Sequence, residues 1–207
     1  MSKWKQAATK GQGDFEKPPQ GNHQAVLVAL IDMGMQENTF QGETKIQHRV
    51  YLVWELTSEK DSKGNNFVAG IDMTFSMNEK AKLRQWVESW RGKKLAEGEE
   101  FDFSVLPGKK CLLSITEKNG YNVVSGVAGL PKGMVVPDPT HKPFLWSPDD
   151  IGEDGEIKLP DWIPWLFGKS VKEHIENRVE ENVGGDAREP SRSEQGKTLQ
   201  QEAAEMF

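Results

Sequence analysis

The sequence predicts a mainly β protein, and three observations predict its fold class. The periodic segments between Gln24 and Ala128 follow the order strand, strand, strand, helix, strand, strand. Residues 45–56 alternate between two faces with a period of two, and Asn119-Gly120 separates the last two strand-like segments as a hairpin turn would. This order is that of the OB-fold, a five-stranded barrel that binds single-stranded nucleic acid or oligosaccharide along its second and third strands.

The three strands before the helix follow from their patterns of polarity. Residues 24–33 are apolar on both faces, as expected of a first strand that pairs on both sides. Residues 45–56 divide by parity into a set expected to face the core, Ile46, His48, Val50, Leu52, Trp54 and Leu56, and a set expected to face water, Lys45, Gln47, Arg49, Tyr51, Val53 and Glu55. The third strand is expected at about residues 67–75.

The helix and the last two strands have local signals of their own. Ser76 and Glu79 have capping-box spacing, which predicts a helix start, and Gly92 stands where a left-handed C-cap is needed. The helix has one apolar stripe, formed by Leu83, Trp86, Val87 and Trp90. Residues 111–116 and 121–127 then form the closing hairpin, with Cys111 as a reduced thiol in a buried strand.

Composition divides the chain into four parts. We expect a flexible basic arm at 1–23, the OB-fold domain at 24–130, a proline-rich connection with a C-terminal helix at 131–183, and a disordered acidic tail at 184–207. The helix is expected to run from Ile163 or Pro164 to Glu181. Residues 1–138 carry 18 basic and 17 acidic residues, whereas residues 139–207 carry 8 and 15. The net charge of -6 therefore arises in the C-terminal third and does not argue against a nucleic-acid site on the barrel.

The outward set of the second strand is the leading candidate for a binding site. Lys45, Arg49 and Tyr51 would place two cations and one aromatic ring on one face, which is how single strands are held, with phosphates on cations and a base on a ring. The loops that flank an OB-fold groove offer further candidates, Phe40, Lys118 and Tyr121. The alternative is that Arg49 and Tyr51 are an ordinary solvated pair on a sheet.

Both ends of the chain offer additional binding residues. Trp4 lies between two lysines and would either stack on a base or plug the barrel. The final residues would form a partner-binding tail, with Glu202, Glu205, Met206 and Phe207 docking in a basic pocket of another protein. The alternative for this tail is a frayed chain end.

The sequence offers little support for an enzyme, a metal or a cofactor. An EF-hand loop starting at Asp150 would place Asp154 and Gly155 correctly, but Gly152, Lys158 and Asp161 would occupy ligand positions that need other residues. The four histidines and the one cysteine show no zinc spacing, and His48 is interpreted as a core histidine. No signal peptide and no apolar run of membrane-spanning length occurs, so a cytoplasmic protein with no membrane partner is expected.

Several short segments together resemble bacteriophage OB-fold single-stranded DNA-binding proteins. The resemblance covers about residues 15–130 and rests on Gly21-x-His23, Ile31-Asp32-Met33-Gly34, residues 52–56, Thr74-x-Ser76 with Lys82-Leu83, and Trp90-Arg91-Gly92-Lys93. It implies a role in phage replication or recombination in the host cytoplasm. The tail is similar to the tails by which such proteins recruit replication or recombination partners, although it is less densely acidic.

Three functional hypotheses follow from the sequence. The first is a sequence-tolerant single-stranded DNA-binding protein, and stacking and phosphate contacts would serve RNA as well. The second is a protein-interaction module of a phage, in which the barrel is a scaffold and the C-terminal segment recruits a partner. The third is a metal-dependent nuclease using the acidic stretch at 149–156. The segment after Pro160 is expected to pack on the barrel or to mediate self-association.

Overall fold

The computed structural model describes residues 16–40 and 42–179, and of Phe40 it describes the backbone alone. The predicted arm is thus described from Glu16 onward, and its last three residues, 21–23, belong to the first strand. Trp4 and the predicted tail lie outside the described residues.

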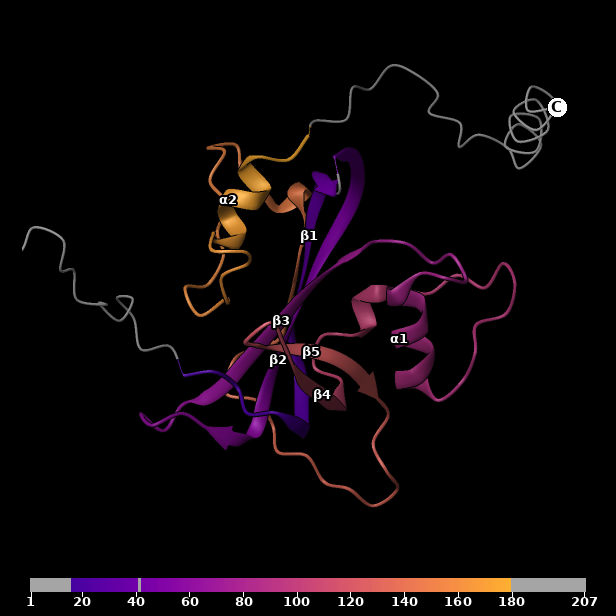
Figure 1. Cartoon of the computed structure of the whole chain (residues 1–207), viewed down its shortest axis with the longest axis vertical. Coiled ribbons are helices and arrows are strands. Elements are labelled where there is room, and N and C mark those ends of the chain that lie inside the picture. The colour runs from indigo at the N-terminus through magenta and orange to yellow at the C-terminus, as the bar shows by residue number, and fades with distance from the viewer. Residues whose placement is uncertain (1–15, 41, 180–207) are drawn as a thin grey trace, which may run out of the picture.

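The described chain forms one antiparallel five-stranded sheet with a helix inserted between its third and fourth strands (Figure 1). Its elements are β1 (Gly21–Phe40), β2 (Glu43–Lys60), β3 (Asn66–Thr74), α1 (Lys82–Arg91), η1 (Phe103–Val105), β4 (Lys110–Lys118), β5 (Tyr121–Ala128), β6 (Phe144–Trp146), η2 (Pro148–Asp150) and α2 (Val171–Glu176). The strand order across the sheet is β3-β2-β1-β4-β5, and β6 adds to β1 in parallel. The predicted order of elements is confirmed, but the sheet is not closed into a barrel because β3 and β5 share no ladder.

Residues 16–18 connect the two edges of this open sheet. The Glu16 carboxylate accepts hydrogen bonds from the Ser62 amide, in the β2–β3 loop, at 2.9 and 3.1 Å. The next residue, Lys17, donates from Nζ to the Gly120 carbonyl at 2.7 Å, in the β4–β5 turn. Neighbouring residues are only about 3.8 Å apart along the chain, so the β3 and β5 edges must come close together at this end. The sheet is therefore curled without being closed.

The inner face of the sheet holds the first hydrophobic core, which α1 covers. Trp54 of β2 lies 6.2 Å from the Trp86 ring and 6.4 Å from the Trp90 ring, measured between centroids. Trp54, Trp86 and Cys111 are buried and Trp90 packs against them, as their spacing predicts. Gly92 caps α1 with a φ of 67°, which confirms the predicted left-handed C-cap.

The predicted start of this helix is wrong. α1 begins at Lys82, and its N-cap, Ala81, makes no side-chain capping bond. Ser76 instead accepts a hydrogen bond from the Asn78 amide at 3.2 Å, and Asn78 accepts one from the Lys80 amide at 3.1 Å. These side chains stabilise local turns, which compete with helix formation for the same donors. The Asn119-Gly120 turn, by contrast, is as predicted, with φ values of 53° and 79° that suit type I′.

The outer face of the sheet carries a second hydrophobic core, which the parity of β2 did not predict. Residues 144–179 fold back over β1 and β2, so that Tyr51 and Val53 pack against Ile163, Leu166 and other residues of this segment. Figure 1 shows α1 and α2 on opposite sides of the sheet. The expectation that Tyr51, Val53 and Glu55 face water is therefore wrong, because every residue from Val50 to Thr57 is buried.

The prediction for the core-facing residues of β2 is also wrong, at the start of the strand. Ile46 and His48 were expected in the core, but Ile46 is exposed and His48 is partly exposed. β1 and β2 are 20 and 18 residues long and continue beyond both cores as a two-stranded hairpin. Residues 174–179 contact the base of this hairpin at Met35 and Gln36, but its outer part, residues 37–39 and 43–46, is exposed although the alternation in the sequence continues there.

The C-terminal helix is much shorter than predicted. α2 spans only Val171–Glu176 and is capped by Ser170, whose hydroxyl accepts from the Glu173 amide at 3.2 Å. Residues 163–170, expected to be helical, form turns, and Phe167-Gly168 both have positive φ values. A backbone in this left-handed conformation cannot continue an α-helix.

A substitution at Gly70 of β3 tests how tightly the second core is packed. The side chain of Tyr51 lies directly against Gly70 of β3, so a Cβ there would overlap the phenol. Gly70→Ala is expected to lower the free energy of unfolding by about 1–3 kcal/mol, the usual cost of overpacking a core. Urea titration would measure it, with Gly126→Ala on β5 as the control, because a Cβ there meets the Ser114 side chain at an ordinary 3.7 Å. Equal unfolding midpoints for the two variants would contradict the prediction.

Candidate nucleic-acid interface

The three predicted residues of β2 do not form one open binding face. Lys45 is exposed and lies 3.2 Å from Glu43, in the projecting hairpin. Arg49 pairs with Asp72 and donates to the Thr74 hydroxyl at 3.0 Å. Tyr51 is only 1% exposed, and its hydroxyl donates to the Pro164 carbonyl at 3.3 Å. Tyr51 is therefore covered by the C-terminal segment and cannot stack on a base in this structure.

Burial also keeps the Tyr51 hydroxyl protonated. Removal from water raises the pKa of this phenol far above its usual range, and the nearby Asp72 carboxylate raises it further. The residue acts as a hydrogen-bond donor that joins β2 to the segment above it.

The loop residues that the sequence singled out are partly brought together. Lys118 and Tyr121 face each other across the β4–β5 turn, and Tyr121 is 67% exposed. The Lys17 ammonium lies 5.3 Å from the centroid of the Tyr121 ring. Phe40 closes β1 at the tip of the projecting hairpin, but its side chain lies outside the described structure, as do Trp4 and the predicted tail residues Glu202, Glu205, Met206 and Phe207.

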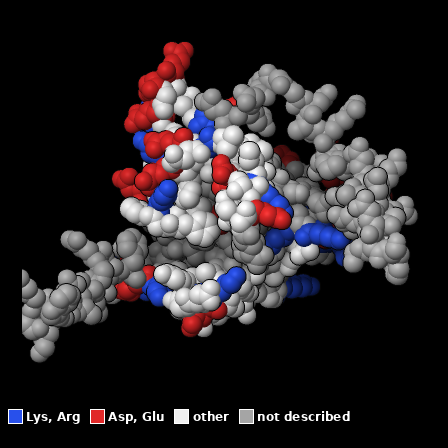
Figure 2. All heavy atoms as spheres, turned by 45° about the horizontal axis from the view of Figure 1, so that its top comes forward, with Lys and Arg blue, Asp and Glu red and all other residues white. Residues whose placement is uncertain are grey.

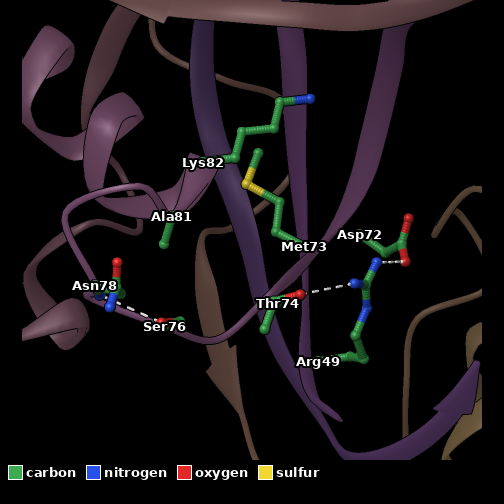
Figure 3. A pocket seen from close by; sticks show the side chains of 8 residues that line it. All are labelled: Arg49, Asp72, Met73, Thr74, Ser76, Asn78, Ala81 and Lys82. Carbon is green, nitrogen blue, oxygen red and sulfur yellow. Dashed lines mark hydrogen bonds and ion pairs between the residues drawn. The ribbon is translucent and has the colours of Figure 1, made fainter. Parts of the chain in front are cut away.

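A hollow of about 410 Å³, lined mostly by polar residues, opens where β3 ends, between Arg49 of β2 and the start of α1 (Figure 3). Figure 3 shows the Arg49 guanidinium held between Asp72 and Thr74, with Lys82 extending from α1 on the other side of Met73. The lining residues are Arg49, Asp72, Met73, Thr74, Ser76, Asn78, Ala81 and Lys82. Besides the Asp72 carboxylate, which pairs with Arg49, guanidinium, ammonium, hydroxyl and amide donors surround this hollow, and such donors are the groups that bind phosphate oxygens.

Lys82 belongs to this hollow and was not predicted as a site residue. Its ammonium lies 4.7 Å from the centroid of the Trp86 ring, one helical turn further along α1. Burial lowers the pKa of Lys82, and the charge of Lys118 lowers it further, while Asp72 acts in the opposite direction. The charge of Lys118 is thus close enough to act on Lys82, although 36 residues separate them in sequence. We call Arg49, Thr74 and Lys82 of this hollow, together with Lys118 outside it, the cationic groove.

One pattern in the sequence could have identified Lys82 as a site residue. It lies four residues before Trp86, which places a cation at the edge of the apolar stripe of α1. No pattern in the sequence could have predicted that Lys118 acts on Lys82, because this depends on how the β4–β5 hairpin packs beside the edge of β3.

A second hollow, of about 300 Å³, is unsuited to phosphate. Aromatic side chains line it, with Phe75 5.1 Å and Phe101 5.0 Å from Phe103 between ring centroids. Asp32 and Asp102 also line it, and no lysine or arginine among its lining residues offsets their negative charges, which would repel a phosphate. His48, expected in the core, instead lies near this hollow with its Nε2 2.6 Å from Asp32 Oδ1, and its ring meets Phe75 edge-on.

No residue of the acidic stretch at 149–156 lines either hollow, and its side chains form local hydrogen bonds. Asp150 accepts from the Ser147 amide at 2.7 Å, and Asp154 accepts from the Glu156 amide at 3.0 Å. Figure 2 shows acidic side chains gathered at the upper left of one face, with both signs of charge interspersed over the rest. Within residues 16–40 and 42–179, no three histidine, cysteine or acidic side chains come together as metal ligands would.

None of the helices in the described part of the chain has both the length and the apolar composition needed to span a bilayer. A scan against protein-family models and a comparison with curated protein sequences each found no match to this chain. The resemblance to phage single-stranded DNA-binding proteins therefore stays a prediction, carried by the residues quoted for it.

Proposed function

We propose that this protein binds single-stranded DNA without strong sequence preference, on an OB-type sheet whose ligand groove is the cationic groove. The observation that carries the proposal is the hollow of Figure 3, which Arg49 of β2 and Lys82 of α1 line together with the donors of Thr74, Ser76 and Asn78. Among the described residues, neither Lys82 nor Lys118 has a carboxylate within ion-pair distance, and the charge of Lys118 acts on Lys82. A phosphate backbone would neutralise these two ammonium groups.

The surrounding groups support a single strand over a duplex. Tyr121 is exposed beside Lys118, so a base can stack on its ring while a phosphate meets the lysine. The five-stranded order with an inserted helix is also that of folds which bind single strands along β2, β3 and their flanking loops. A place in phage replication or recombination rests on the sequence resemblance alone.

Titration of the full chain with a fluorescently labelled oligothymidine at low and high salt tests the proposal. Binding should weaken as salt rises, with a log-log slope of about -2 if Arg49, Lys82 and Lys118 each neutralise one phosphate. Competition with RNA and with duplex DNA of equal length then defines the preferred polymer. The proposal fails if the oligothymidine does not bind at low salt, or if binding is insensitive to salt.

A further inference from the structure

Residues 165–169 present two large aromatic side chains to solvent on a short hairpin. Trp165 is 68% exposed and Phe167 is 80% exposed, whereas Leu166 between them is buried in the second core. Exposed residues of this size are costly to leave in water, since burying such a ring is worth about 1.5–3 kcal/mol. Two of them, on either side of a buried anchor, form a candidate contact surface.

The backbone holds this hairpin in one conformation. The Leu166 amide donates to the Lys169 carbonyl at 2.8 Å, and the Lys169 amide donates back to Leu166 at 3.0 Å. The ring Nε2 of His174 in α2 lies 2.9 Å from the same Leu166 carbonyl. The aromatic pair is therefore displayed on a fixed support, which lowers the entropy cost of binding a ligand.

Phe167 also occupies a backbone position that disfavours it. Its φ is 50° and that of Gly168 is 78°, so these two residues form a two-residue turn of the type I′ class. Asparagine or glycine is usual at the first position of such a turn, and a bulky residue there is strained. Phe167 is 80% exposed, so burial within the described chain does not offset this strain.

Tyr51 links the hairpin to the Arg49 end of the cationic groove. Pro164, which enters the hairpin, accepts the hydrogen bond of Tyr51. Tyr51 lies opposite Asp72, the partner of Arg49, and is two residues from Arg49 on the same face of β2, about 7 Å away. The segment that covers Tyr51 thus sets exposed aromatic rings close to the place where Tyr51 was expected to stack.

We infer that Trp165 and Phe167 are a base-stacking platform for single-stranded DNA whose phosphates lie in the cationic groove. This inference rests on the proposed function and names further residues for it. Successive bases stack on the two rings in place of Tyr51, and the exposed Lys169 is placed to meet a phosphate between them. Stacking of this kind is tolerant of sequence, because every base has a flat face.

Two substitutions test the platform in the full chain. Trp165→Ala and Phe167→Asn are each expected to raise the Kd for oligothymidine about five- to one-hundred-fold, the range for losing one stacked base. Their salt slope should match that of the unaltered protein, because no ionic contact is removed. Phe167→Asn should melt no lower than the unaltered protein, since asparagine suits the left-handed turn. Val135→Ala is the control, an exposed apolar residue in the connection after β5, and should leave the Kd unchanged.

The outcomes separate this inference from the proposed function. If both substitutions leave the Kd unchanged while charge reversal in the cationic groove weakens binding, the platform is overturned and the proposed function stands. If the unaltered protein does not bind oligothymidine, the proposed function itself fails. If the substitutions change the sedimentation mass and not the Kd, the hairpin is a contact between copies of this chain, and the stacking role is overturned.

Discussion

Replacing Glu55 by alanine is expected to lower the free energy of unfolding by about 3–5 kcal/mol, the cost of breaking a buried charged network. Glu55 lies in β2 with 0% of its side chain exposed. Its carboxylate accepts from the Thr140 and His141 amides at 2.7 and 2.9 Å, and also from Asn66 in β3. It lies 2.7 Å from the His141 ring nitrogen Nδ1. Alanine would leave these partly buried donors without their acceptor.

The consequence reaches beyond β2, because Glu55 is the attachment point of the connection between β5 and β6. His141 stacks on Trp162 with ring centroids 4.2 Å apart, and Trp162 packs against the second core. Losing Glu55 therefore loosens residues 139–143 and the cover over Tyr51. Urea unfolding followed by tryptophan fluorescence would measure the loss, with Glu117→Ala on the exposed part of β4 as the control.

The same carboxylate predicts a dependence of stability on pH. Burial acts to raise the pKa of Glu55, but hydrogen bonds from Asn66, Thr140 and His141 outweigh it and hold the pKa below the ordinary value of 4.5. A lowered pKa in the folded state means that the contribution is present above pH 4.5 and is lost as the pH falls below it. The Glu55→Gln variant should therefore lose less stability than the unaltered protein does between pH 7 and pH 4.

The alanine variant has its own contradicting outcome. A Glu55→Ala variant as stable as the unaltered protein at pH 7 would show that the network does not stabilise the fold.

Reversing two charges, Lys82→Glu together with Lys118→Glu, is expected to weaken oligothymidine binding at low salt by about one-hundred-fold or more. Each lysine is proposed to meet a phosphate, and a hydrogen bond between charged groups is worth about 1.5–3 kcal/mol. The log-log salt slope should become shallower by about 1.4, since two phosphate contacts are lost. Filter binding or fluorescence anisotropy across a salt series measures both quantities.

A matched control separates a local effect from one of net charge. Lys93→Glu together with Lys94→Glu changes the net charge by the same amount on two exposed residues beyond the other end of α1. This control should weaken binding much less than the groove variant. Equal losses in the two double variants would mean that binding follows overall charge, and the cationic groove would then have no special role.

Local patterns were sufficient wherever a few neighbouring residues decide the backbone. The Asn119-Gly120 turn, the Gly92 cap and the stripe of Trp86 and Trp90 were all predicted from their own segments. The interactions that form these features are short-range, since they depend on backbone conformation and on which side chains share one face. The prediction that a helix starts at Ser76 is wrong for a related reason, because the Ser76 hydroxyl accepts a hydrogen bond from the nearer Asn78 amide.

The candidate site could be predicted only in part, and β2 shows why. Alternation can identify which side chains share a face, but it cannot say whether a later segment will cover that face. Tyr51 and Glu55 share one face in both the prediction and the structure, but residues 139–179 turned that face into a core. The groove formed by Lys82 and Lys118 likewise depends on two elements meeting in space.

The order of strands and the position of the helix were decided by the sequence itself, through hydrophobic periodicity and turn residues that act over a few positions. Only the tertiary structure decided that the sheet curls without closing, that Tyr51 is buried, and that Trp165 and Phe167 are exposed. These features depend on contacts between residues more than 100 positions apart, such as Tyr51 with Pro164. A face of a strand is buried only when another segment packs on it, and no local pattern in β2 shows which segment will do so.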